Sequence, residues 1–459
     1  MISAIILAAG CGEGIFPFST VRNKVTLPIL NTPIIRRLVL QLKEIGVEDI
    51  TILTGYLEQS VRHALHDIRG LSFLKSKEND TLTDTIRSNL DTFSSSETLI
   101  LYGDIATTQE NLSHFIKIHQ EQHNESSILV SNQKPFPLHT TFIQKGTDNK
   151  LKHLVFDRQT SEFWFGGALI GKTKSLKEAF NYEPGIIRSA PLGAMPAPEG
   201  NLISAIDGML ERKCEISCIS ANSFVVDIDH PWDLIEANQK ALSNIFEKME
   251  DSIIDKSAFI SDGADISPNT KLWIHEGGKI EKGTIIKGNL VLGMNSHIAI
   301  GALLEENIFV NSDTNISEFA KIHKNSIIGE NNKILHNAEF EGITLDTVFM
   351  VHTCCVSGVI GSHVDIGAGT ISATWRFDDK IKEVRCKQRK EIPPYHGNLT
   401  YLGDYCRTGI NVMFMPGVRI GAYSCIGPGV IVNNDIHPYS LVLLKQQIEI
   451  KSWGPNRYP

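Results

Sequence analysis

One aliphatic or aromatic side chain recurs at every sixth position between residues 280 and 340 of this chain, without a break. The positions are Ile280, Ile286, Leu292, Ile298, Leu304, Val310, Ile316, Ile322, Ile328, Ile334 and Phe340. A spacing of six fits neither an amphipathic helix nor an alternating strand. It is typical of a parallel β-helix, in which each hexad forms one short strand plus a corner and its apolar side chain stacks on those of neighbouring coils.

The same spacing continues on both sides of this run, which extends the predicted β-helix over residues 251–459. It is found before the run at Ile254, Ile260, Ile266 and Leu272, and after an interruption at Leu402, Thr408, Phe414, Ile420, Ile426 and Val432. A β-sandwich would instead show alternating runs and irregularly spaced turns. At about 372–400 the hexads give way to polar and basic residues, which we interpret as a loop insert, either a solvated excursion or a functional segment.

The N-terminal part predicts an α/β domain of Rossmann-like type over residues 1–230. Residues 3–7 are an apolar run typical of a buried parallel strand, and a glycine-rich loop follows at 10–14. Residues 32–46 carry helix start and stop signals around apolar positions at helical spacing, and the next strand is expected at 50–53. A strand, a helix and a second parallel strand are the building unit of this fold.

Two further strands of this domain end in carboxylates. Residues 99–102 are followed by Gly103-Asp104, and the run Val225-Val226-Asp227-Ile228-Asp229 repeats this pattern. Ligands of open α/β sheets bind beyond the carboxyl ends of the strands, so we expect Asp104 and the Gly10 loop to lie in one crevice. Pro231 then opens an amphipathic helix, predicted over 231–250, that bridges to the β-helix.

Composition narrows the classes of function. The formal net charge of −8 argues against a nucleic-acid partner, and no apolar run reaches the roughly 18 residues of a membrane span, so a cytoplasmic protein is expected. The eight cysteines lack the paired spacing of a zinc site. We interpret them as small hydrophobic residues.

Several motifs together resemble the bifunctional sugar-1-phosphate nucleotidylyltransferase/acetyltransferase family. They are Leu7-Ala8-Ala9-Gly10-x-Gly12, Lys24, Leu27-Pro28, Tyr102-Gly103-Asp104, Pro231-Trp232-Asp233-Leu234, Ile366-Gly367-Ala368-Gly369-Thr370 and Thr408-Gly409-Ile410-Asn411. The resemblance spans nearly the whole chain. It implies a left-handed β-helix in the second domain, assembly into a homotrimer, and two activities, nucleotidyl transfer and acetyl transfer.

For the first domain the resemblance implies a nucleoside triphosphate and a sugar 1-phosphate as substrates, with Mg²⁺ as cofactor. Lys24 corresponds to the catalytic lysine, and Asp104 and Asp227 correspond to the metal ligands. The implied nucleotide-binding residues are Leu7, Ala8, Gly10, Gly12 and Thr83. These residue types suit the reaction, because attack on a phosphate requires backbone amides, a cation and metal-bound carboxylates around accumulating negative charge.

For the second domain the resemblance implies His352 as the general base that deprotonates an amino sugar phosphate. Acetyl-CoA would lie in a groove between coils of neighbouring subunits, with Gly409 and Gly427 as its binding residues. A lone histidine in an irregular coil is also compatible with a structural role.

The chain departs from the family pattern at both sites. Gly14 stands where the family has an arginine, Asn23 stands where it has a proline, and Cys355 replaces a tyrosine. Arg22 could supply the missing cation. Three readings therefore stay open: an enzyme with one or both activities, a chain that keeps only acyl transfer, and a non-catalytic sensor or scaffold that binds nucleotide sugars.

Overall fold

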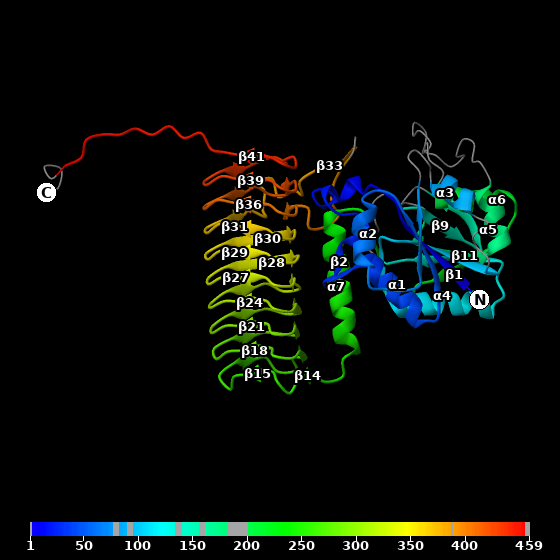
Figure 1. Cartoon of the computed structure of the whole chain (residues 1–459), viewed down its shortest axis with the longest axis horizontal. Coiled ribbons are helices and arrows are strands. Elements are labelled where there is room, and N and C mark those ends of the chain that lie inside the picture. The colour runs from blue at the N-terminus through cyan, green and yellow to red at the C-terminus, as the bar shows by residue number, and fades with distance from the viewer. Residues whose placement is uncertain are drawn as a thin grey trace.

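The computed structural model describes residues 2–76, 82–89, 95–133, 140–155, 161–181, 201–386 and 389–454. An α/β lobe and a prism of stacked short strands lie side by side, with helix α7 (Pro231–Lys248) between them (Figure 1). The predicted combination of a Rossmann-like domain and a parallel β-helix is confirmed.

The α/β lobe is built on a mixed sheet with β1 (Ile2–Ala8) near its centre. The order of its main path is β10-β9-β11-β6-β1-β4-β5, and β8 and β12 extend it beside β11. β1 pairs in parallel with β4 (Asp49–Thr54) and β6 (Glu97–Tyr102). The other strands are β5 (Leu71–Lys75), β8 (Ser126–Ser131), β9 (Phe142–Lys145), β10 (Leu151–Val155), β11 (Phe163–Lys172) and β12 (Ile216–Ser220).

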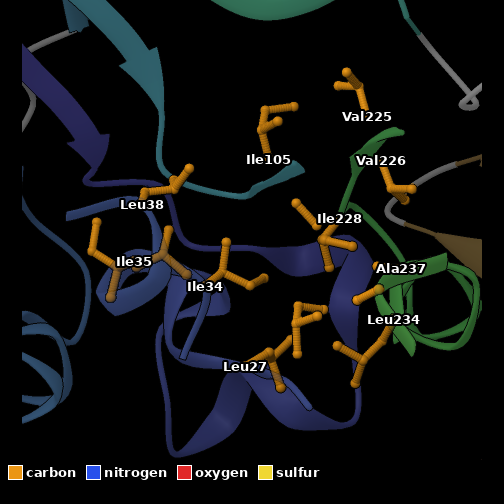
Figure 2. Close-up of a cluster of buried hydrophobic side chains, with 14 of the residues drawn as sticks. Leu27, Ile34, Ile35, Leu38, Ile105, Val225, Val226, Ile228, Leu234 and Ala237 are labelled. Carbon is orange, nitrogen blue, oxygen red and sulfur yellow. The ribbon is translucent and has the colours of Figure 1, made fainter. Parts of the chain in front are cut away.

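Helices cover this sheet and meet α7 in a shared core. They are α1 (Ile34–Glu44), α2 (Glu58–Ala64), α3 (Leu82–Asn89), α4 (Gln109–Glu121), α5 (Thr173–Phe180) and α6 (Leu202–Glu211). A small antiparallel pair, β7 (Ile105–Thr107) with β13 (Val225–Asp227), lies between α1 and α7. Figure 2 shows Ile34 and Leu38 of α1 facing Ile228 and Leu234 across this core, which joins α7 to the α/β lobe.

The β-helix has three faces. The apolar residue at every sixth position from Ile280 to Phe340 points inward and is 0% exposed. The first face, which we call the α7 face, contains β14 (Ile253–Ile254), β17 (Leu272–Ile274), β20 (Leu290–Leu292), β23 (Ile308–Val310), β26 (Ile327–Ile328), β35 (Thr400–Leu402) and β38 (Arg419–Ile420). The open face contains β16 (Asp265–Ile266), β19 (Ile285–Ile286), β22 (Leu303–Leu304), β25 (Lys321–Ile322), β32 (Ile371–Ser372), β37 (Met413–Phe414) and β40 (Ile431–Val432).

The third face is one continuous parallel ladder. Its strands are β15 (Phe259–Ile260), β18 (Lys279–Ile280), β21 (His297–Ile298), β24 (Asn315–Ile316), β27 (Lys333–Ile334), β29 (Phe349–Met350), β31 (Asp365–Ile366), β36 (Arg407–Thr408), β39 (Cys425–Ile426) and β41 (Leu441–Val442).

The interruption of the hexads after Phe340 has a structural cause. β28 (Glu339–Thr344) and β30 (Cys355–Ile360) each run straight from the open face onto the α7 face, where the other coils make a corner. Glycine is required in this stack, since a Cβ at Gly358 would lie 1.8 Å from the backbone oxygen of Thr400. Each of these coils is therefore shorter, and the spacing of six returns once the chain reaches Ile366.

The α7 face carries an apolar stripe on its outer side. Trp273, Val291, Phe309, Ile327, Ile343, Val359 and Tyr401 follow one another in register along it. These side chains belong to the same hydrophobic core as α7 and the α/β lobe. Burying such a stripe is favourable at roughly 25 cal/mol per Å² of apolar surface, so the two lobes pack as one body.

The segment inserted at about 372–400 leaves the β-helix toward the α/β lobe, where its label β33 appears in Figure 1. Its hairpin pairs β33 (Val384–Cys386) with β34 (Arg389–Glu391). The Tyr395 hydroxyl then donates a hydrogen bond of 3.1 Å to Asp233 of α7. Among the residues that the structure describes, no helix combines the length and the apolar character needed to cross a membrane.

Candidate functional site

A cavity of about 380 Å³ opens at the carboxyl ends of β1 and β6. This is the edge of the sheet at which the sequence predicted a ligand site. The residues that line the cavity are Leu7, Ala8, Ala9, Gly10, Asn23, Lys24, Val25, Leu53, Ser76, Leu82, Tyr102, Asp104, Asp227 and Asp229. The predicted residues Leu7, Ala8, Gly10, Lys24, Asp104 and Asp227 are thus brought together by the fold.

Three carboxylates and one ammonium group form the polar wall of this cavity. Oxygens of Asp104, Asp227 and Asp229 lie within 4.8 Å of one another. Lys24 forms an ion pair with Asp104, and its Nζ lies 2.8 Å from Oδ1 of Asp229. Three carboxyl groups thus face one ammonium group, and a divalent cation is a ligand that such an acidic cluster can bind.

The pKa values in the cluster follow this imbalance. Burial, together with the charges of Asp229 and Asp104, raises the pKa of Asp227 well above its usual range. Burial alone would lower the pKa of Lys24, but Asp104 and Asp229 outweigh it and raise that pKa, so Lys24 is charged. A charged lysine beside carboxyl groups with perturbed pKa values is typical of a site that binds phosphate and metal.

Asn23 fixes the loop that leads into the cavity. Its Nδ2 donates to the backbone oxygens of Ala8, at 3.2 Å, and Tyr56, at 2.7 Å. Gly12 has a positive φ of 60°, and a Cβ there would lie 3.1 Å from Cβ of Lys24. The glycine therefore lets the loop turn closely over the lysine stem.

Two expected nucleotide-binding residues do not line the cavity. Gly12 lies behind Lys24, as described, and Thr83 is buried in α3, whereas its neighbour Leu82 reaches the cavity. Asp229 was missing from the predicted site although it lies there. It lies two residues beyond Asp227, past the end of β13, where the chain bends before α7 and brings its carboxylate next to those of Asp104 and Asp227.

The structure shows why Gly14 cannot be replaced by a larger residue and where the neighbouring Arg22 points. A Cβ at Gly14 would lie 2.6 Å from the backbone oxygen of Asp229, so the loop is packed too tightly for a side chain. Arg22 points to the β-helix, where it pairs with Asp404 and donates to Oγ of Ser362 at 3.2 Å. Neither residue supplies a cation to the cavity.

The predicted second site lies on the β-helix. His352 is half-buried at a coil corner and stacks on His336, with ring centroids 4.9 Å apart. A Cβ at Gly409 would lie 2.6 Å from the nitrogen of Pro428, and one at Gly427 would lie 2.9 Å from a side-chain carbon of Leu443. Close stacking of coils thus explains Gly409 without a ligand, whereas the Leu443 side chain can move away from Gly427, and acetyl-CoA binding stays a prediction.

Comparisons with known proteins agree with this architecture. Residues 3–138 match the nucleotidyl transferase family, and residues 400–434 match the bacterial transferase hexapeptide repeats. The bifunctional sugar-1-phosphate nucleotidylyltransferase/acetyltransferase of Sulfurisphaera tokodaii is 27% identical over 95% of this chain and 98% of its own length. The bifunctional protein GlmU of Methanococcus maripaludis is 28% identical over 98% and 99%, and that of Methanocaldococcus jannaschii is 26% identical over 97% and 98%.

Proposed function

We propose that this chain, a relative of the bifunctional sugar-1-phosphate nucleotidylyltransferase/acetyltransferases, transfers a nucleotidyl group from a nucleoside triphosphate to a sugar 1-phosphate. The observation that carries the proposal is the group of Asp104, Asp227 and Asp229 around Lys24, next to the Gly10 loop. The near full-length relatives favour an enzyme over a sensor or scaffold.

The reaction requires little more than binding and charge stabilisation from the protein. An oxygen of the sugar phosphate attacks the α-phosphorus, and the bond to pyrophosphate breaks. Backbone amides of the loop around Gly10 would hold phosphate oxygens, and the Lys24 ammonium would stabilise the charge that develops on them. Because Gly14 and Arg22 place no cation here, Lys24 carries this role among the described residues of the cavity.

The residues fit a hard divalent cation. Their donors are carboxylate oxygens from three aspartates within 4.8 Å of one another, which is the ligand type of Mg²⁺. Asp104 and Asp227 would hold the ion, and the ion would neutralise the phosphates during transfer. Asp229, which pairs with Lys24 at 2.8 Å, would orient the lysine.

The first test is Asp227→Asn in the full-length protein, compared with Asp49→Asn, an exposed aspartate at the start of β4. Pyrophosphate release should be measured across nucleoside triphosphates and sugar 1-phosphates in the presence of Mg²⁺. We expect Asp227→Asn to lower kcat/KM by about 100-fold or more, because it removes a metal ligand, and Asp49→Asn to behave as wild type. Equal activity of both variants would place the metal elsewhere, and an inactive wild type would favour the scaffold.

For the second domain we propose acetyl transfer from acetyl-CoA to an amino sugar phosphate, with His352 as general base. The half-buried position of His352 and the hexapeptide repeats support this assignment. His352→Ala should abolish acetyl transfer because the ammonium must lose a proton before attack, while His336→Ala, its stacking partner, should retain most of it. Thiol release from acetyl-CoA measures both, and an active His352→Ala would reassign the base.

We also propose that the protein is a homotrimer and acts in the cytoplasm. All eight cysteines are free, as expected for a reducing compartment. The open face supports a trimer, since Ile285, Ile371, Met413 and Ile431 are exposed on its outer side. We divide the chain at residues 230 and 250, on either side of α7.

A further inference from the structure

A second group of potential metal ligands lies where the inserted hairpin meets α7. It consists of His230, directly before the helix, with Cys386 and Glu391 from the two strands of the hairpin. One donor atom from each residue lies within 4.8 Å of the other two. The side chains of His230 and Glu391 are 5% and 8% exposed, and Cys386 is 6% exposed. The cluster is therefore built into the contact between the two lobes.

The hairpin presents its two ligands by simple strand geometry. Val384 pairs with Glu391, and Cys386 lies two residues further along the same strand, so all three side chains share one face. Val384 and Cys386 are buried while Arg385 between them is exposed. This alternation points the thiol and the carboxylate toward His230.

The His230 ring is held as a metal ligand requires. Its Nδ1 lies 3.2 Å from Oδ2 of Asp233, and it stacks on Trp232 with ring centroids 4.5 Å apart. Its Nε2 faces the hairpin and lies 2.9 Å from Oε2 of Glu391. A carboxylate behind a histidine whose other nitrogen faces further ligands is the usual outer shell of a zinc site.

We propose that His230, Cys386 and Glu391 bind one divalent cation of the zinc type, which locks the hairpin onto the start of α7. Imidazole, thiolate and carboxylate are zinc ligands, and a tetrahedral site separates such donors by about 3.3 to 3.7 Å. The donors lie within 4.8 Å of one another, so changes of no more than about 1.5 Å in their separations would reach this geometry. The fourth position would be taken by the second oxygen of Glu391 or by water.

The ion would also act on the first site, through Asp233. Oδ2 of Asp233 accepts hydrogen bonds from the backbone nitrogens of His230, at 2.7 Å, and Asp229, at 3.1 Å. Asp229 in turn pairs with Lys24 in the cavity. Fixing His230 would thus fix the segment that holds the catalytic lysine.

The competing arrangement is a buried ion-pair network without metal. Burial alone would lower the pKa of His230, but hydrogen bonds to Asp233 and Cys386 raise it to about 10. A charged imidazole between Asp233 and Glu391 would then hold the hairpin. The two arrangements differ in what they predict for metal content and for the reactivity of the thiol.

The experiment uses the full-length protein, stripped with a chelator and reloaded with Zn²⁺ or Co²⁺. With excess Mg²⁺ present to occupy the aspartate site, wild type should bind about one Zn²⁺ per chain by mass spectrometry and show the near-ultraviolet thiolate charge-transfer band with Co²⁺. Cys386→Ser should lose the band and bind Zn²⁺ roughly 100-fold more weakly or worse. Cys11→Ser, at the loop of the first site, should retain both. The aspartate site offers no sulfur, so it cannot produce the band.

A second measurement avoids variants altogether. Zn²⁺ should protect Cys386 from alkylation in the wild type, read by peptide mass spectrometry, and leave the exposed Cys11 as reactive as before. Absence of zinc binding at micromolar concentration would establish the metal-free network. A band that persists in Cys386→Ser, or equal alkylation with and without Zn²⁺, would also overturn the proposal.

Discussion

At the scale of single residues, two glycines of one loop are predicted to behave in opposite ways. A Cβ at Gly14 meets the backbone oxygen of Asp229 at 2.6 Å, whereas a Cβ at Gly10 meets nothing within 4 Å. Gly14→Ala should therefore destabilise the protein by about 1–3 kcal/mol, because backbone must shift. Gly10→Ala should leave the free energy of unfolding unchanged and weaken nucleotide binding, since Gly10 lines the cavity.

Urea unfolding and nucleotide calorimetry on both variants check this prediction. An equally stable Gly14→Ala would mean that the loop relaxes freely. Wild-type nucleotide affinity in Gly10→Ala would remove the loop from the phosphate site. The same geometry predicts that Gly14→Arg, which introduces the arginine that the resembled family has at this position, lowers activity.

Residue types in local motifs predicted several of the residues that line the first cavity, but not the groups beside it. Lys24, Asp104 and Asp227 could be named because each stands in a short motif. Cys386 could not, since its partner His230 is remote in sequence and the residues share no spacing pattern. A cysteine without a motif was interpreted as a small hydrophobic residue, and only the tertiary contact indicates more.

At the scale of elements, the hexads predicted most of the interior of the β-helix, although Ile254 in the first coil is 47% exposed, and they predicted little of its exterior. Inward positions recur every sixth residue, so one pattern identifies all three faces. The outer stripe of Trp273, Val291 and Phe309 recurs only once per coil, and nothing local distinguishes it from the other two faces. The packing of α7 on this face therefore emerged only from the structure.

The shortened coils show a second limit of periodicity. A strand that passes a corner, as β28 and β30 do, breaks the count of six without ending the β-helix. From the sequence this appears as an interruption, and the cause lies in contacts such as Gly358 against Thr400.

At the scale of the whole molecule, the exposed apolar residues of the open face predict self-association. Ile371→Lys should convert a trimer into the 50.9 kDa monomer, because it places a charge in an apolar contact. Lys333→Gln, on the third face, is the control. Multi-angle light scattering at micromolar concentration measures both masses, and a monomeric wild type would contradict the assembly.

The extended C-terminal arm agrees with such an assembly. From residue 443 it leads away from the last coil (Figure 1) and exposes large apolar side chains, namely Leu443, Leu444, Ile448, Ile450 and Trp453. A neighbouring copy is the partner that would cover them.

Helix α7 sets a limit on the length of the β-helix beside it. At its C-terminal end, Nζ of Lys271 from the first coils donates hydrogen bonds to the backbone oxygens of Phe246 and Met249, at 2.8 and 2.7 Å. At its N-terminal end, the hydroxyl of Tyr395 from the insert donates a hydrogen bond to Asp233. Its 18 residues span about 27 Å. The ladder from β14 through β17, β20, β23, β26 and β28 to β30 spans about 29 Å at roughly 4.8 Å per step.

Both ends of the helix are therefore fixed to the β-helix, one to the first coils and the other to the insert. One whole coil added or deleted between residues 290 and 340 would keep every hexad in phase and still move the insert about 4.8 Å past the start of α7. The coils that follow the insert are tied to the α/β lobe as well, because Asp404 pairs with Arg22 and Arg419 lies over the ring of Phe16. Changes in the length of the prism are therefore easiest at its far C-terminal end, while the stretch beside the helix has its length fixed.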